Sequence, residues 1–235
     1  MPLSLEPSGS LFVIFRKPAS RPPPDGILDD VFVDPEPSET MLLEGPWQVA
    51  FLDGRGAPGE VIMENLECWT QHSDEGVKYY SGAARYRNRI SLTEHFVRRH
   101  PTIFLEFERV CDIARITVNG RSFGTLWTQP WRMNIAEALQ AGENTIDIEV
   151  ANRWINRLIG DERFPVDYTY RSQGSVFTLG ALETLPDWLY NSDVERTDGR
   201  VTFASWKHYS ADSPLVASGL LGTVKLKAYS ETLGD

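Results

Sequence analysis

The sequence has little cysteine, a deficit of positive charge and no long hydrophobic run. Its two cysteines, Cys68 and Cys111, could pair in an oxidising compartment, but they form neither a disulfide framework nor a zinc-binding spacing. The 33 acidic and 23 basic residues give a formal charge of −10, which disfavours contact with phosphate backbones. No stretch approaches the roughly 18–20 apolar residues that cross a bilayer. The first residues also lack the basic and apolar regions of an export signal. We therefore expect a soluble chain that binds neither nucleic acid nor a membrane.

Motifs for cofactors and for common nucleophiles are also missing. The four histidines are far apart, without the close spacing of a zinc site, and there is no Gly-rich phosphate loop or Gly-x-Ser-x-Gly elbow. No run of Asp and Asn has calcium-loop spacing, although acidic loops of sheet proteins can hold calcium. We expect no cofactor, with calcium as the one metal that such loops would favour.

The residues that are present indicate many short strands. Apolar residues make up 41% of the chain and aromatic residues 11%, including seven tryptophans. Alternating apolar and polar residues predict strands at Trp47–Phe51, Ala83–Leu92, Thr102–Phe107, Ala114–Val118, Arg121–Trp127, Asn144–Val150, Arg200–Phe203 and Thr223–Tyr229. Asn119-Gly120 predicts a tight hairpin turn, and Ile135–Ala141 is the best candidate for a helix. Many short strands with almost no helix predict an all-β protein, either a sandwich or a barrel.

The pattern also suggests a division of the chain. Ser10–Phe15 is a short strand signal, followed by a Pro-rich tract from Pro18 to Pro37 that reads as an extended linker. We predict an N-terminal strand and Pro-rich arm over residues 1–40 and a β-sandwich over 41–235. Regular signals break down between residues 154 and 199, and so long a connection in a compact domain is usually functional or mobile.

Several segments in a fixed order resemble the sugar-binding jelly-roll domain of family 2 glycoside hydrolases. They are Tyr86-Arg87, Leu105–Val110, Ala114–Gly120, Gly124, Trp131 and Gly142–Ile146. The resemblance implies an antiparallel β-sandwich of the jelly-roll, galactose-binding-domain-like class.

The flanking segments are similar to the C-terminal part of family 106 α-L-rhamnosidase-like proteins. These segments are Ser8–Arg16, Tyr80–Gly82, Gly124–Trp127, Asn152–Asp161 and Ser218–Gly222. In that family the sandwich follows a catalytic barrel that holds the carboxylates and a calcium ion. A barrel of about 250 residues does not fit into this chain beside the sandwich. The resemblance leaves open whether the chain is a truncated reading frame, part of a split gene or a stand-alone module.

Six residues are the candidate carbohydrate contacts: Trp127, Trp131, Trp154, Asn156, Arg157 and Asp161. The indoles would stack on the apolar faces of sugar rings, and the polar side chains would exchange hydrogen bonds with hydroxyl groups. The same residue types also have structural uses, because tryptophan fills cores and an Arg157–Asp161 ion pair would fix a loop.

Three functions remain open at this stage. The first is a carbohydrate-binding or accessory sandwich of an α-L-rhamnosidase-like glycoside hydrolase, with a catalytic barrel as its partner. The second is a small enzyme acting on rhamnose- or galactose-containing glycans. Its carboxylates would be Asp161 or Glu162 with Glu183, Asp187 or Glu195, since glycoside hydrolysis needs two acids across a bound sugar. The third is a purely structural domain that docks a partner chain.

Overall fold

The computed structural model describes residues 36–51, 55–166, 168–174, 179–191, 193–194 and 199–230. The strand expected at Ser10–Phe15, most of the Pro-rich arm and Glu195 lie outside these residues. Across the described part of the chain, no helix is both long enough and apolar enough to span a membrane.

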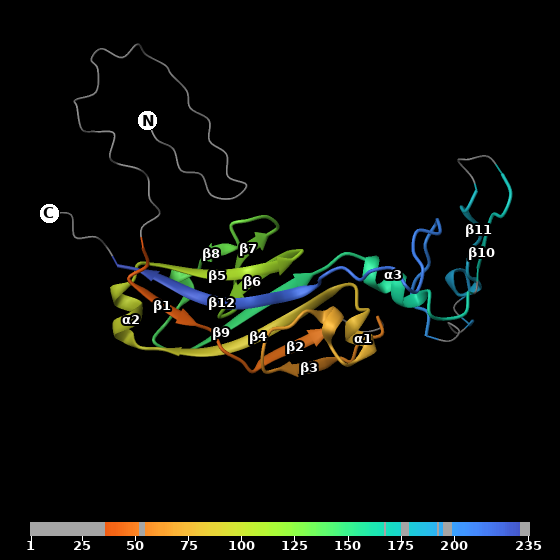
Figure 1. The fold of residues 1–235 in the computed structure, drawn as a ribbon. Coiled ribbons are helices and arrows are strands. Elements are labelled where there is room, and N and C mark those ends of the chain that lie inside the picture. Colours follow the sequence, from red (N-terminus) through yellow and green to blue (C-terminus); the bar gives the residue numbers. More distant parts are fainter. Residues whose placement is uncertain are drawn as a thin grey trace, which may run out of the picture.

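Two antiparallel sheets pack face to face (Figure 1). The four-stranded sheet has the order β1 (Glu39–Leu42), β12 (Gly219–Tyr229), β5 (Thr102–Cys111) and β8 (Arg132–Asn134). The six-stranded sheet has the order β3 (Glu60–Met63), β2 (Trp47–Phe51), β4 (Ala83–Leu92), β9 (Gly142–Ala151), β6 (Ile113–Val118) and β7 (Arg121–Leu126). The antiparallel β-sandwich expected from the sequence is confirmed.

The core lies between the sheets and follows the alternation of the strands. On β5, Ile103, Leu105 and Phe107 are all buried on the inward face, as the sequence predicted. The Tyr86 hydroxyl is also buried in the core, where it accepts a hydrogen bond from the Trp69 indole and one from the backbone N–H of Leu220 (3.2 Å). Burial raises the pKa of this phenol, so it stays protonated at neutral pH. The polar core group therefore links β4 to β12 across the two sheets.

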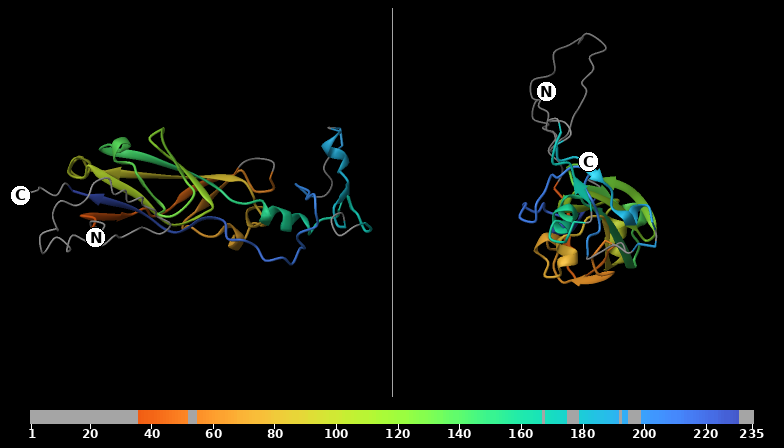
Figure 2. Two further views of the ribbon diagram at one scale, coloured as in Figure 1. Left: turned by 90° about the horizontal axis from the view of Figure 1, so that it is seen from above. Right: turned by 90° about the vertical axis from the view of Figure 1, so that its right-hand side faces the viewer.

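Short helices and turns connect the strands. They are α1 (Glu75–Lys78), α2 (Glu94–Arg99), α3 (Ile155–Asp161) and the 3₁₀ turns η2 (Trp69–Gln71), η3 (Ala136–Ala138) and η4 (Asp187–Leu189). A small two-stranded sheet, β10 (Thr169–Tyr170) with β11 (Leu182–Thr184), follows α3. Figures 1 and 2 place α3, β10 and β11 beyond one end of the sandwich, whereas β1 begins and β12 ends at the opposite end.

The hairpin expected at Asn119-Gly120 joins β6 to β7. Both residues have positive φ, 49° and 81°, as a type I′ turn requires. The return strand ends at Leu126, one residue earlier than expected. Both cysteines are free thiols in this structure.

Two expected elements are wrong. Only the 3₁₀ turn at Ala136–Ala138 forms in place of the helix at Ile135–Ala141. The Asn144 side chain binds both the N–H and the carbonyl of Gln140, and these bonds divert the backbone from a helix. Nor is there a strand at Arg200–Phe203, because the N–H groups of Val201 and Thr202 donate to the Asp161 carboxylate rather than to a neighbouring strand.

Candidate functional site

Two exposed tryptophans lie at one end of the six-stranded sheet. The strand register brings Ala151 at the end of β9 level with Ile113, and Leu126 at the end of β7 level with Ala114. Trp127 directly follows β7 and is 73% exposed, while Trp154 lies three residues after β9 and is 50% exposed. Since neighbouring strands are about 4.8 Å apart, β7 and β9 are separated by roughly 10 Å across β6. Both indoles therefore follow strands that end at the same end of the sheet.

Polar and cationic groups lie between and beside these indoles. Arg153 Nε donates to Asp112 Oδ2 at 2.9 Å, and both residues are solvent-accessible. The Arg55 guanidinium lies over the Trp154 ring, 4.9 Å from its centroid. We call Asp112, Ile113, Trp127, Arg153 and Trp154 the tryptophan rim. It offers apolar ring faces together with hydrogen-bond donors and acceptors, the combination that a sugar requires.

Sequence reasoning identified the two indoles of the rim and missed the ion pair between them. Asp112 and Arg153 belong to different strand ends, and only the register of β6 with β9 brings them together. One indication of this ion pair was present in the sequence, because Arg153 directly precedes the predicted contact residue Trp154.

Trp131 lies apart from the rim. Its side chain is partly buried and packs against the core. Its carbonyl accepts from the Phe107 N–H at 2.8 Å, which places it beside the middle of β5 rather than at a strand end. Trp131 therefore packs against the core, whereas the side chains of Trp127 and Trp154 are exposed.

The three predicted polar contacts, Asn156, Arg157 and Asp161, lie together and buried in α3. The Asn156 amide binds the N–H and the carbonyl of Val216, at 2.8 Å and 2.7 Å. Arg157 Nη2 pairs with Asp161 Oδ1 at 2.8 Å. The Asp161 carboxylate also accepts from both backbone and side chain of Thr202. These polar groups thus fasten α3 to the segments around residues 202 and 216.

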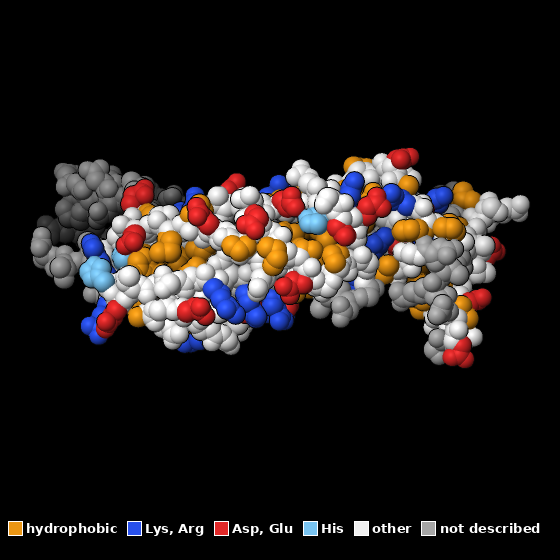
Figure 3. Space-filling view, turned by 90° about the horizontal axis from the view of Figure 1, so that it is seen from below, with side chains coloured by type: hydrophobic (Ala, Val, Ile, Leu, Met, Phe, Trp, Pro, Cys, Tyr) orange, Lys and Arg blue, Asp and Glu red, His pale blue; other side chains and the backbone are white. Residues whose placement is uncertain are grey.

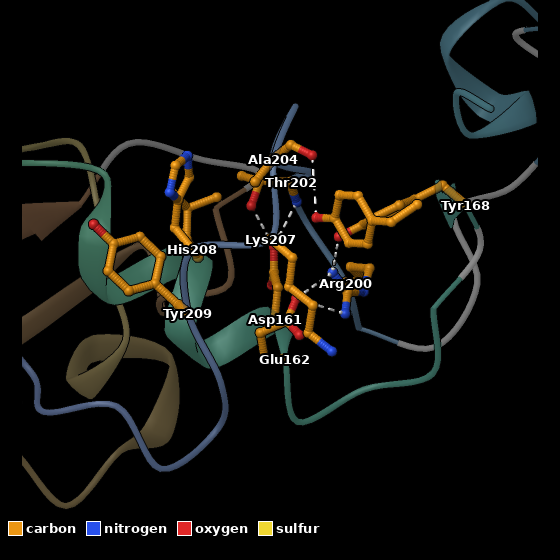
Figure 4. A pocket seen from close by; sticks show the side chains of 11 residues that line it. Asp161, Glu162, Tyr168, Arg200, Thr202, Ala204, Lys207, His208 and Tyr209 are labelled. Atoms are coloured by element: carbon orange, nitrogen blue, oxygen red, sulfur yellow. Dashed lines mark hydrogen bonds and ion pairs between the residues drawn. The ribbon is translucent and has the colours of Figure 1, made fainter. Parts of the chain in front are cut away.

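A small cavity lies beside α3 (Figure 4). Glu162 pairs with Arg200 at 3.3 Å, and Arg200 donates to the Tyr168 hydroxyl at 2.6 Å. Burial raises the pKa of Tyr168 and keeps its phenol protonated. The cavity volume is about 10 Å³, close to that of a single water site, so a sugar ring does not fit.

The carboxylates do not form an accessible pair near α3. Asp161 is only 1% exposed and already accepts several hydrogen bonds, and Glu162 is held by the buried Arg200. A hydrolytic site needs two carboxyl groups flanking an open sugar position. Among the residues that the structure describes, no three His, Cys, Asp or Glu side chains come together as a metal site.

Comparisons with known proteins agree with this fold. Residues 69–178 match the family model described as "Glycosyl hydrolase 2 galactose-binding domain-like". A putative β-glucuronidase of Formosa agariphila is 34% identical over 193 residues, which are 82% of this chain and 16% of the relative.

Solved structures are also similar. The rhamnosidase from Novosphingobium sp. PP1Y is 32% identical with a TM-score of 0.62, over 90% of this chain and 16% of that protein. The β-glucuronidase from Ruminococcus gnavus, solved with D-glucuronic acid, has a TM-score of 0.52 at 17% identity over 85% of this chain and 31% of that protein, a likeness of fold alone. The chain thus spans about one sixth of the length of its two more similar relatives.

Proposed function

This chain carries a β-sandwich that matches the galactose-binding-domain-like family model of glycoside hydrolases, and from this premise we propose the following function. The chain is a non-catalytic carbohydrate-binding or accessory domain of an α-L-rhamnosidase-like glycoside hydrolase, and the bonds of the glycan are broken elsewhere. The similarity to the Novosphingobium rhamnosidase supports this choice of enzyme class.

The observation that carries the proposal is the exposure of two indoles at one end of the sheet. Buried tryptophans such as Trp47 and Trp69 stabilise the core, but a side chain that is 73% exposed, like Trp127, contributes little to it. Trp127 and Trp154 would stack on the C–H faces of sugar rings, and Asp112 and Arg153 would bind hydroxyl groups. Asn156, Arg157 and Asp161 act as positioning residues that hold the segment following Trp154.

Binding at so open a surface is expected to be weak. Hydroxyl groups of a sugar exchange water hydrogen bonds for protein ones with little net gain. The affinity therefore depends on the stacked ring faces, which contribute on the order of 1 kcal/mol each.

The test is a titration of the purified chain with rhamnose, galactose and pectic oligosaccharides, followed by tryptophan fluorescence. We expect a saturable change, weakened about fivefold in Trp127→Ala and in Trp154→Ala. Trp188→Phe, which keeps an aromatic ring near Phe203 and lies outside the rim, is the matched control. Trp131→Phe shows whether the half-buried indole contributes.

The other two functions give different results in the same experiment. Turnover of aryl glycosides by the purified chain would identify it as a small enzyme. If the chain shows neither binding nor turnover, the structural docking role is the one function that remains.

A further inference from the structure

An open groove lies on the outer face of the six-stranded sheet, where β2 begins. Its volume is about 320 Å³, within the size range of small-ligand sites. The residues that define it are Glu44, Pro46, Gln48, Ile62, Arg87 and Arg89. We call it the arginine groove.

Strand register builds its floor. Gln48 on β2 lies opposite Ile62 on β3 and opposite Arg87 on β4, so the three side chains form a row across one face. Ile62 is 54% exposed and gives the row an apolar end. The groove thus combines an aliphatic wall, an amide and a guanidinium, with the acidic residue Glu44 also in its lining.

Arg87 is fixed in this row. Its Nε and Nη2 bind the two oxygens of Asp147 at 2.7 Å and 3.1 Å. This pairing raises the pKa of the guanidinium and keeps it charged. The same pairing leaves Nη1 of Arg87 without a hydrogen bond to any residue that the structure describes.

Arg89 lies two residues further along the same face of β4. It is exposed and has no ion-pair partner among the described residues. By contrast, Arg85 and Arg115 share the Glu149 carboxylate at 3.7 Å and 3.3 Å. Basic side chains also gather beside a band of hydrophobic side chains on the long face shown in Figure 3. A free guanidinium at the edge of a groove in a chain of charge −10 is a feature that folding does not require.

We propose that the arginine groove binds a sugar unit that carries a carboxylate. A guanidinium fork matches a carboxylate in geometry and charge, so Arg89 and Nη1 of Arg87 bind the acid group. The Gln48 amide binds a hydroxyl group, while Ile62 and Pro46 contact the C–H face of the ring.

The ligand class rests on the proposed function, since it assumes that the chain meets glycans, but the site is a different one. Arg89 lies six residues along β4 from Ala83, which pairs with Ala151 at the rim end of the sheet. At about 3.3 Å per residue, the two sites are roughly 20 Å apart. One glycan chain of several units could contact both.

The test is calorimetric titration of the whole chain with a trimer of galacturonic acid and, separately, a neutral galactose trimer. We expect saturable binding of the acidic trimer, weakened about tenfold in Arg89→Gln, because a hydrogen bond to a charged group is lost. Arg85→Gln is the matched control, since it removes a guanidinium from the same face of the same strand outside the groove. Thermal melting checks that both variants fold.

Three outcomes would overturn the proposal. The first is an equal loss of acidic-trimer binding in Arg85→Gln and Arg89→Gln. The second is an equal loss of neutral-trimer and acidic-trimer binding in Arg89→Gln, and the third is equal binding of a tri-glutamate peptide. Equal competition by a sulfated trimer would also contradict the proposal, because the groove would then recognise negative charge rather than a carboxylate. Trp188→Phe, which lies outside both sites, should leave acidic-trimer binding unchanged. If Arg89→Gln has no effect while the rim variants lose binding of neutral sugars, only the groove is refuted.

Discussion

At the scale of single residues, the buried carboxylate of Asp161 connects α3 to the segment around residues 201 and 202. It pairs with the buried Arg157 and accepts hydrogen bonds from Val201 and Thr202. A buried ion pair adds little net stability, but the loss of one partner leaves the other charge uncompensated. The segment after α3 is therefore held by the contacts of this side chain.

Replacing Asp161 by Asn should lower the free energy of unfolding by about 3 kcal/mol, because Arg157 would remain buried without its counter-charge. Urea denaturation measures the change. Glu75→Gln is the control, since it breaks an Arg–carboxylate contact of the same 2.8 Å length to Arg163 at the surface, where less than about 1 kcal/mol is expected. Equal effects in the two variants would contradict the assigned role.

At the scale of elements, β12 begins at a glycine where any side chain would clash with its neighbours. Gly219 has a φ of +99°, and a Cβ there would lie 2.6 Å from Nε1 of Trp69 and 2.8 Å from the Tyr86 hydroxyl. The close approach lets the Tyr86 hydroxyl bind the N–H of Leu220. The first residue of this strand thus positions a core hydrogen bond.

Gly219→Ala should destabilise the fold by more than about 2 kcal/mol, since a steric clash adds to the cost of a positive φ. Gly142→Ala isolates the φ contribution, because Gly142 begins β9 with a φ of +90° and open space around its Cβ position. A loss of about 1 kcal/mol is expected there. Chemical denaturation of both variants gives the comparison, and a smaller loss in Gly219→Ala than in Gly142→Ala would refute it.

The strands were predictable from the sequence because burial on one face leaves an alternating pattern, as in Ala83–Leu92 and Thr102–Phe107. Helix α3 was not, since its inward face carries Asn156, Arg157 and Asp161. A helix is recognised in a sequence by apolar residues that recur about every 3.6 positions, and polar residues at the buried positions of α3 interrupt this repeat. The same three residues suggested a ligand site because sugar contacts and internal hydrogen bonds use the same chemistry.

The rim was only partly predictable. Exposed and buried tryptophans look alike in a sequence, and Trp127 and Trp131 are separated by three residues yet differ in exposure. The partner of Arg153 could not be inferred, since Asp112 lies 41 residues away in the chain. Register, rather than local pattern, decides which side chains share a strand end.

At the scale of the whole molecule, the two candidate sites lie on different parts of the sandwich surface. The tryptophan rim lies at the end of the six-stranded sheet from which α3 continues, and the arginine groove lies roughly 20 Å further along β4. The relatives devote about five sixths of their length to other regions. In the proposed function, the sandwich retains a glycan near a catalytic region and leaves it chemically unchanged.

Equilibrium dialysis against a rhamnose-containing pectic oligosaccharide tests this account most directly. It predicts that the sugar accumulates on the protein side, is displaced by excess unlabelled ligand and is recovered with its chain length intact by chromatography. An even distribution across the membrane, or recovery of shortened chains, would contradict it.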